Sequence, residues 1–328
     1  MPSLWQQLLQ PHVLAASWLA VAAFLLTAFN GEVPEPYMDE IFHVPQAQRY
    51  CRGDFAHWDP KITTPPGLYL LAAAYVRATE AARSALAALS GLSLPSNADA
   101  CGIGVLRSFN AASAAVCAAL FHAAYRRLHP EAGSRFALAM AATMSMLPLH
   151  FFFSFLFYTD VLSTALVTAS YLAVLHENAT AAAVLSLASI GVRQTNAVWA
   201  GFCLGVGVIR HVDASVPCTS RGRPLPSQVV ELLTTVWELK WRLLRKFWGL
   251  VLVQLLFVAF LQHNGGVVLG DRSNHVSVFH PTQLLYLAFY TAAAAWAVHL
   301  RPQRAASALA GAWQRLRRDP LLTAVSLA

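Results

Sequence analysis

The sequence predicts an all-α polytopic membrane protein, on the basis of its charge content, its hydropathy and the length of its apolar runs. Of the 328 residues, 57% are hydrophobic and 12% are charged, whereas soluble domains carry about 25% charged residues. The mean hydropathy is +0.49. This composition excludes a disordered chain, a collagen and a nucleic-acid-binding tail, and it does not suit a water-soluble globule. At about 20 apolar residues per helical span, the length allows about eight crossings.

The apolar segments define the predicted helices. They cover residues 13–29, 66–89, 103–125, 136–157, 161–175, 181–192, 197–209, 247–261, 283–299 and a last run from Leu321. Segment 66–89 carries Arg77, Glu80 and Arg83 along one helical face. A charge at mid-bilayer costs about 2.5–3.5 kcal/mol, so we expect this helix to lie at the interface. The first segment follows a stretch without Lys or Arg, which favours a retained signal-anchor over a cleaved signal peptide.

Basic loops give the predicted orientation, because Arg and Lys collect on the cytosolic side of membranes. The layout that follows is a single membrane domain over residues 1–328. It has a first span at 13–29, a non-cytosolic loop at 30–102, spans two to six at 103–209, a cytosolic loop at 210–246, spans seven and eight at 247–299 with a non-cytosolic loop at 262–282, and the start of a further segment at 300–328.

Four polar stretches lie on the non-cytosolic side of this layout, and we expect them to converge. They are the acidic loop around Asp39, residues 158–160, residues 193–196 and the loop 264–280. An arginine at membrane depth between two half-length helices indicates a binding site, and its guanidinium suits a phosphate. The alternative is that Arg193 pairs with Asp160 for structure.

The other polar features each have two possible interpretations. The acidic stretch is either catalytic or simply solvated at the interface. Lys61 either contacts a phosphate or extends to lipid head groups. The glycine-bearing loop 263–280 is either a binding loop, since glycine permits close approach of a ligand, or an ordinary turn. Cys51 and Cys101 share the predicted non-cytosolic loop, and the sequence leaves open whether they pair.

Two long motifs, EPYMDEIFHVPQAQRYC at residues 35–51 and WDPKITTPPGLYL at residues 58–70, closely resemble one family. It is the family of endoplasmic-reticulum dolichyl-phosphate-glucose alpha-1,2-glucosyltransferases. Further matches follow in order at residues 158–160, 192–196 and 264–275, so the resemblance covers essentially the whole chain. It implies a GT-C-type glycosyltransferase that inverts the anomeric centre. The implied donor is dolichyl phosphate glucose, and the implied acceptor is the dolichyl-diphosphate oligosaccharide that already carries two glucoses.

The resemblance also implies roles for individual residues. Asp39 is the expected catalytic base, because inversion in one displacement needs a single carboxylate base for the attacking 2-hydroxyl. Arg193 and Lys61 are expected to stabilise the leaving phosphate, and Glu40 and Asp160 to orient acceptor hydroxyls. The expected substrate-binding residues are Glu40, His43, Lys61, Asp160, Arg193, Gln194, Asn196, Asp271, Arg272 and His275. Neither a metal nor another cofactor is expected, since these cations belong to the chain itself.

The resemblance further implies a multi-pass protein of the endoplasmic reticulum membrane, with its site facing the lumen. Its expected partners are the two dolichol-linked substrates and membrane lipid, with no nucleic acid. Members of the family are longer, so we expect the chain, which stops in an apolar segment after Pro320, to be C-terminally incomplete. The alternatives are a membrane transporter and a non-catalytic accessory subunit of the glycosylation pathway. A transporter needs polar access from both faces, whereas the predicted cytosolic loops are basic.

Overall fold

The computed structural model describes residues 4–90, 100–215, 224–271, 273, 280–294, 307, 310–311 and 313–314. The chain divides into two compact units, Met1–Arg272 and Ser273–Ala328. Within the described ranges every regular element is a helix. Four helical stretches are long and apolar enough to cross a membrane: Val13–Glu32, Ile103–Leu128, Gln194–Ser215 and Lys240–Asn264. These helices confirm the prediction of an all-α polytopic membrane protein.

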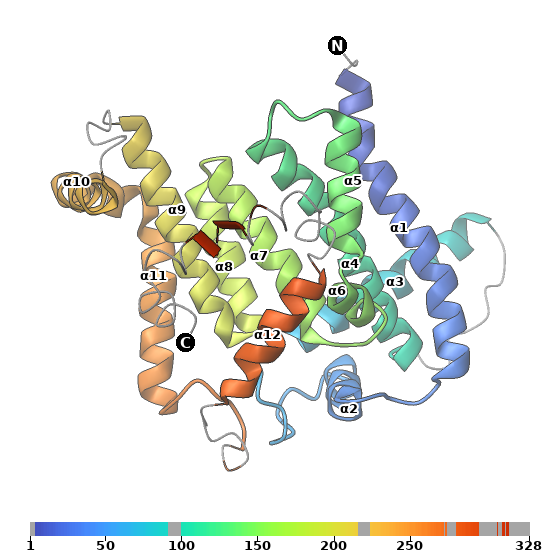
Figure 1. Ribbon diagram of the computed structural model, residues 1–328. Helices are drawn as coiled ribbons and strands as arrows, with labels where there is room; N and C mark the ends of the chain where they lie inside the picture. The colour runs from blue at the N-terminus through green and yellow to red at the C-terminus, as the bar shows by residue number, and fades with distance from the viewer. Residues whose placement is uncertain are drawn as a thin grey trace. The chain divides into compact units, whose positions relative to one another are not determined.

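Six helices of the first unit pack beside one another (Figure 1). They are α1 (Leu4–Glu32), α4 (Ile103–Leu128), α7 (Thr159–Leu175), α8 (Ala179–Val192), α9 (Ala197–Ser215) and α11 (Lys240–Asn264). Where α4 and α7 end, Arg127 Nε donates to the carbonyl oxygen of Leu175 at 3.1 Å, and Lys246 Nζ lies 3.4 Å from Glu177 Oε2. We call this the basic end. The acidic end is the opposite one, where α1 finishes and α4 and α7 begin.

The predicted segment 136–157 is not one continuous helix, because the structure breaks it into two helices. They are α5 (Ser134–Ser145) and α6 (Pro148–Phe153). Pro148 has no backbone N–H, and its ring disfavours a helical conformation at the preceding residue. Leu147 is accordingly extended, with φ −55° and ψ 130°. The proline that ends α5 also starts α6, where a first-turn proline costs no hydrogen bond.

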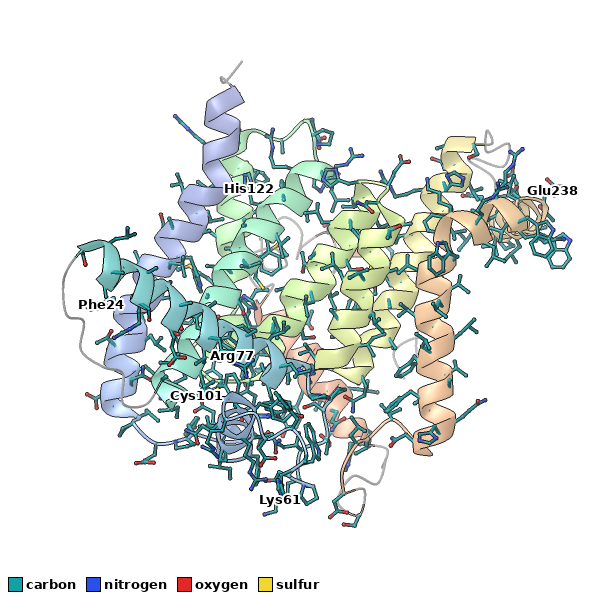
Figure 2. All side chains as sticks on the ribbon, turned by 180° about the vertical axis from the view of Figure 1, so that it is seen from behind. Phe24, Lys61, Arg77, Cys101, His122 and Glu238 are labelled. Carbon is teal, nitrogen blue, oxygen red and sulfur yellow. A yellow bond between two sulfur atoms is a disulfide. The ribbon has the colours of Figure 1, made fainter. Side chains whose placement is uncertain are left out.

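The connection between α1 and α4 holds two further helices, α2 (Glu40–Cys51) and α3 (Gly67–Ser90). A disulfide joins Cys51 to Cys101, with the two Cα atoms 6.5 Å apart, so the pairing that the sequence left open is formed. It fastens the end of α2 next to the start of α4. Figure 2 shows α3, labelled at Arg77, running obliquely across α1 and α4. One face of its first half is buried as far as Val76, and its position at a membrane interface stays a prediction.

The predicted cytosolic loop 210–246 is largely helical. The helix α9 continues to Ser215, α10 (Leu225–Glu238) follows, and α11 already begins at Lys240. The sequence of α10 is amphipathic, which explains why a helix forms in a segment taken for a loop. The large apolar residues exposed on α10 are Leu225, Val229, Val230, Leu233 and Trp237. In the second unit, α12 (Pro281–Ala294) begins two residues before the predicted segment 283–299.

Candidate active site

Asp39 stands at the point where the chain leaves the α1–α2 connection and enters α2. It is the N-cap residue of α2, and its side chain makes no capping hydrogen bond. The residue is exposed. Its backbone N–H donates to the hydroxyl oxygen of Tyr158, 2.5 Å away. Met38, directly before it, has φ +55°, a left-handed conformation that a side chain other than glycine rarely adopts. The surroundings therefore impose the backbone that presents Asp39 to solvent.

An arginine–carboxylate pair lies beside this acid. Arg193 Nη1 donates to Asp160 Oδ1, and the two side chains are 37% and 38% exposed. Asp160 sits in the first turn of α7, and Arg193 is the extended residue, φ −141°, that separates α8 from the short 3-10 helix Gln194–Asn196. Because the pair is half-exposed, the guanidinium remains accessible from solvent. The sequence offered a phosphate contact or a pair with Asp160, and the structure shows that the pair exists.

His43 lies within the electrostatic range of both Asp39 and the Asp160–Arg193 pair. It is 8% exposed, and its Nδ1 lies 2.6 Å from the hydroxyl oxygen of Tyr69. Burial lowers the pKa of His43, outweighing the opposing effect of the carboxylates of Asp39, Asp160 and Glu40. At neutral pH the ring is therefore uncharged, with one nitrogen that donates and one that accepts. Burial also raises the pKa of Tyr158 to about 12, so its hydroxyl stays protonated.

Three loops close around these residues at the acidic end. Gln194 Nε2 donates to the carbonyl oxygens of Thr63, at 2.7 Å, and Val267, at 3.1 Å. The backbone N–H of Asp271 donates to the carbonyl oxygen of Pro60 at 2.8 Å. Gly270, next to it, has φ +71°, and a Cβ there would strike the carbonyl oxygen of Pro60. With the Asp39–Tyr158 and Asp160–Arg193 contacts, these bonds confirm that the four polar stretches meet at one end.

Glu40 does not occupy the position expected of a substrate-binding residue. Its side chain is fully buried and forms an ion pair with Arg107, Nη2 to Oε2 at 2.7 Å. The same carboxylate accepts the backbone N–H of Tyr37 at 3.0 Å and of Phe157 at 2.6 Å. With its oxygens taken by protein donors, Glu40 cannot reach an acceptor hydroxyl in this conformation. We therefore correct its role from binding substrate to holding the local backbone.

Two amides at the break between α8 and α9 need the same correction. Both are buried. Gln194 donates its two amide hydrogens to the carbonyl oxygens of Thr63 and Val267. Asn196 Nδ2 donates to Ser163 Oγ and to the carbonyl oxygen of Ser189, each at 2.8 Å. Because a buried polar group needs hydrogen-bond partners, these side chains serve to join loops and helices. The sequence pattern places them near the site but does not distinguish a ligand contact from such a brace.

The remaining predicted residues fall into two groups. Lys61 is exposed, and its Nζ lies 5.2 Å from the ring centroid of Phe42. Asp271 is exposed at the edge of the converging loops. Arg272 and His275 lie outside the described residues. Among the residues that are described, no three His, Cys, Asp or Glu side chains group closely enough to hold a metal ion.

Arg107 is the important residue that the sequence interpretation missed. It lies within the predicted span 103–125, and its side chain is fully buried. The rule that drew attention to Arg193, an ionisable residue at membrane depth, applies equally to Arg107. Its partner Glu40 is 67 positions away in the sequence, so the sequence could indicate that Arg107 needs a partner without identifying it.

Comparisons with known proteins agree on one family. The sequence model described as the DIE2/ALG10 family matches residues 33–328. Three similar curated proteins, from Arabidopsis thaliana, Mus musculus and Homo sapiens, are each named Dol-P-Glc:Glc(2)Man(9)GlcNAc(2)-PP-Dol alpha-1,2-glucosyltransferase. They are 37%, 33% and 31% identical over 80%, 94% and 90% of this chain. The chain spans 60%, 67% and 64% of their respective lengths. No solved structure matches significantly.

Proposed function

This chain belongs to the DIE2/ALG10 family, and we propose that it transfers glucose from dolichyl phosphate glucose to the dolichyl-diphosphate oligosaccharide Glc2Man9GlcNAc2. The new bond is alpha-1,2, and the anomeric centre inverts. The names of the relatives supply the donor and the acceptor. The observation that carries the proposal is an exposed carboxylate, Asp39, beside a half-exposed arginine at the place where four polar stretches meet.

Asp39 acts as the base. It takes the proton from the 2-hydroxyl of the terminal glucose as that oxygen forms a bond to the anomeric carbon of the donor. The bond between the anomeric carbon and the phosphate oxygen breaks in the same displacement, and dolichyl phosphate leaves with the electron pair. A single carboxylate suffices, because inversion proceeds through one oxocarbenium-like transition state. Since the Asp39 side chain makes no capping hydrogen bond, it remains available for this proton transfer.

Arg193 stabilises the charge that develops on the leaving phosphate. One N–H of its guanidinium is used by Asp160, and the fork carries five donors in all. Asp160 therefore orients the arginine while other donors stay available for phosphate oxygens. Lys61 is a second cation for the same charge, since it is exposed near the start of α2, against Phe42. His43, neutral and buried, supports the site through Tyr69.

The acidic end faces the lumen of the endoplasmic reticulum in this proposal. Two observations support that orientation. Arg127 and Lys246 lie at the opposite end, as expected for the cytosolic side. The disulfide between Cys51 and Cys101 requires an oxidising compartment. A glycosylation sequon inserted at Ala56 should therefore be modified, and one inserted at Ser220 should not. Modification at Ser220 and not at Ala56 would show that the orientation is the opposite of the proposed one.

The base assignment is tested by comparing Asp39→Asn with Asp54→Asn in the purified chain. Both aspartates lie in the same connection, but Asp54 is bonded to His57, at 2.9 Å from its Nδ1. Asp39→Asn should lower glucose transfer by about 10²–10⁴-fold, and Asp54→Asn should leave it near the wild-type rate. Cells that lack the terminal glucosylation step should be rescued by wild type and not by Asp39→Asn. Transfer by Asp39→Asn at the wild-type rate would remove Asp39 from the mechanism, and an inactive wild-type chain would overturn the proposed activity.

A further inference from the structure

The guanidinium of Arg107 is surrounded by hydrogen-bond acceptors, although it lies inside the protein. Its Nε and Nη2 donate to the two carboxylate oxygens of Glu40, at 3.0 and 2.7 Å. Its Nη1 donates to Asn30 Oδ1 at 2.9 Å and to the carbonyl oxygen of Val33 at 2.7 Å, and Nη2 also donates to the carbonyl oxygen of Glu35 at 3.1 Å. An arginine keeps its charge in proteins, so this arrangement compensates a buried cation fully.

These acceptors all come from one short stretch of chain, between the last turn of α1 and the first turn of α2. Asn30, Val33 and Glu35 precede Asp39, and Glu40 follows it directly. Glu40 in turn fixes the backbone N–H groups of Tyr37 and Phe157. Residues 30–40 are thus wrapped around a single guanidinium that belongs to α4. We call Arg107 and Glu40, with the groups bonded to them, the Arg107 clamp.

Asp39 is held from both sides by this arrangement. On one side its neighbour Glu40 is immobilised by Arg107. On the other side its own N–H is bonded to the hydroxyl of Tyr158, which directly follows Phe157, a further partner of Glu40. The left-handed Met38 shows that the surroundings determine the backbone here. Because the Asp39 side chain is exposed and makes no capping hydrogen bond, its position depends on this backbone.

We propose that Arg107, Glu40 and Tyr158 are positioning residues that fix the backbone of Asp39 in the geometry required for proton transfer. The inference rests on the proposed function, in which Asp39 is the catalytic base. A catalytic group must be held within about 0.5 Å of its productive position. A buried ion pair is often no more stabilising than apolar residues of the same volume, so stability alone is a weak reason for this one. Placement of the adjacent acid gives the clamp a function.

The test measures kcat and KM for dolichyl phosphate glucose in the folded fraction of three variants. Glu40→Gln keeps the shape of the side chain but places an amide NH2 group, a hydrogen-bond donor, against the N–H donors of Arg107. Arg107→Lys keeps the charge but loses the bidentate fork. Tyr158→Phe removes the acceptor of the Asp39 N–H while leaving the buried pair intact. Each should lower kcat by about 10–100-fold, since a misplacement of about 1 Å costs that much, with KM changed by less than about threefold.

Arg127→Lys is the matched control, because Arg127 lies on the same helix but bonds the Leu175 carbonyl at the basic end. It should alter yield or thermal stability without altering kcat in the folded fraction. Wild-type kcat in all three variants would overturn the positioning role, even if their yields fall. If Glu40→Gln and Arg107→Lys fail to fold, Tyr158→Phe still tests whether the hydrogen bonds that hold the Asp39 backbone determine kcat, and wild-type kcat in that variant would overturn the positioning role. Inactivity of the wild type, or activity of Asp39→Asn, would instead refute the proposed function and the clamp with it.

Discussion

Two arginine–carboxylate pairs lie at the acidic end, and they differ in one respect above all. Arg107 and Glu40 are completely buried, whereas Arg193 and Asp160 are 37% and 38% exposed. The buried pair uses its hydrogen-bonding groups on the protein itself. The exposed pair uses one bond between its partners and keeps the rest of the guanidinium within reach of solvent. The same two functional groups thus support the backbone in the buried pair, whereas in the exposed pair they leave a cation available to a ligand.

Burial, more than residue type, therefore separates the charged groups that support the structure from those available to a ligand in this molecule. Removing one member of a buried pair leaves an uncompensated charge in a medium of low dielectric constant. Removing one member of an exposed pair costs little, because water and salt screen the charge that remains. Changes in the buried pair should therefore have the larger effect on stability, and changes in the exposed pair should have the larger effect on activity.

The largest expected effect is on stability at the buried pair. Arg107→Met should destabilise the chain by about 3–5 kcal/mol, because it leaves the Glu40 carboxylate buried without its cation. Arg193→Met should cost no more than about 1 kcal/mol. The two unfolding midpoints, measured in one detergent by tryptophan fluorescence during heating, check this. Equal losses in the two variants would contradict the contrast. The double variant Glu40→Gln with Arg107→Met should be more stable than Arg107→Met alone, since no buried charge remains unpaired.

The next effect is on activity at the exposed pair. Arg193→Met should lower kcat/KM for dolichyl phosphate glucose by about 10²–10³-fold, the usual cost of removing a group that stabilises developing negative charge. Asp160→Asn should have a smaller effect, because the cation stays and only its orientation is loosened. Steady-state transfer to the diglucosylated acceptor measures both. A value of kcat/KM in Arg193→Met close to that of wild type would show that another cation binds the phosphate.

The smallest effect is a pH dependence of stability at His43, which lies between the two pairs. Burial lowers its pKa in the folded state, so the unfolded chain binds a proton first as the pH falls below about 6.5. Neutral His43 therefore makes its full contribution to the free energy of unfolding above that pH. Below that pH the contribution is lost, by at most about 1.4 kcal/mol per pH unit. Unfolding midpoints at pH 7.5 and 5.5 should therefore differ less in His43→Gln than in wild type.

The control for this experiment is His57→Gln, since His57 is exposed on the same connection. It should keep the difference between the two pH values close to that of wild type. If His43→Gln retains the full difference, the pKa of His43 does not differ between the folded and unfolded chain and the cause of the pH dependence lies elsewhere.

Much of the helical framework was predictable from apolar runs alone. The segments 161–175 and 181–192 match α7 and α8 to within two residues at each end, because polar residues flank both helices. The break within segment 136–157 was not predicted, although Pro148 lies inside the otherwise continuous apolar run and could have indicated it. The helices within the predicted cytosolic loop 210–246 were not predicted for another reason. Its many basic residues suggested solvent, but the amphipathic pattern of α10 is a helical one.

The sequence predicted which segments form the candidate site, but it did not predict the role of each side chain within them. The sequence and its resemblance to a family brought together Asp39, Asp160 and Arg193. Side-chain roles depend on contacts between distant residues, which is why Gln194 and Asn196, adjacent to Arg193, were taken for ligand contacts.

Composition and periodicity alone predict a helical membrane protein with its polar stretches gathered at one end, because apolar runs of span length and the polar segments between them can be read directly from the residues. Asp39 and Glu40 are adjacent, and adjacent residues project in different directions from a regular backbone. Which of the two faces solvent was decided by the tertiary structure. Arg107 lies 67 positions beyond Glu40, and only folding brings its guanidinium to the inward carboxylate and so leaves Asp39 outside.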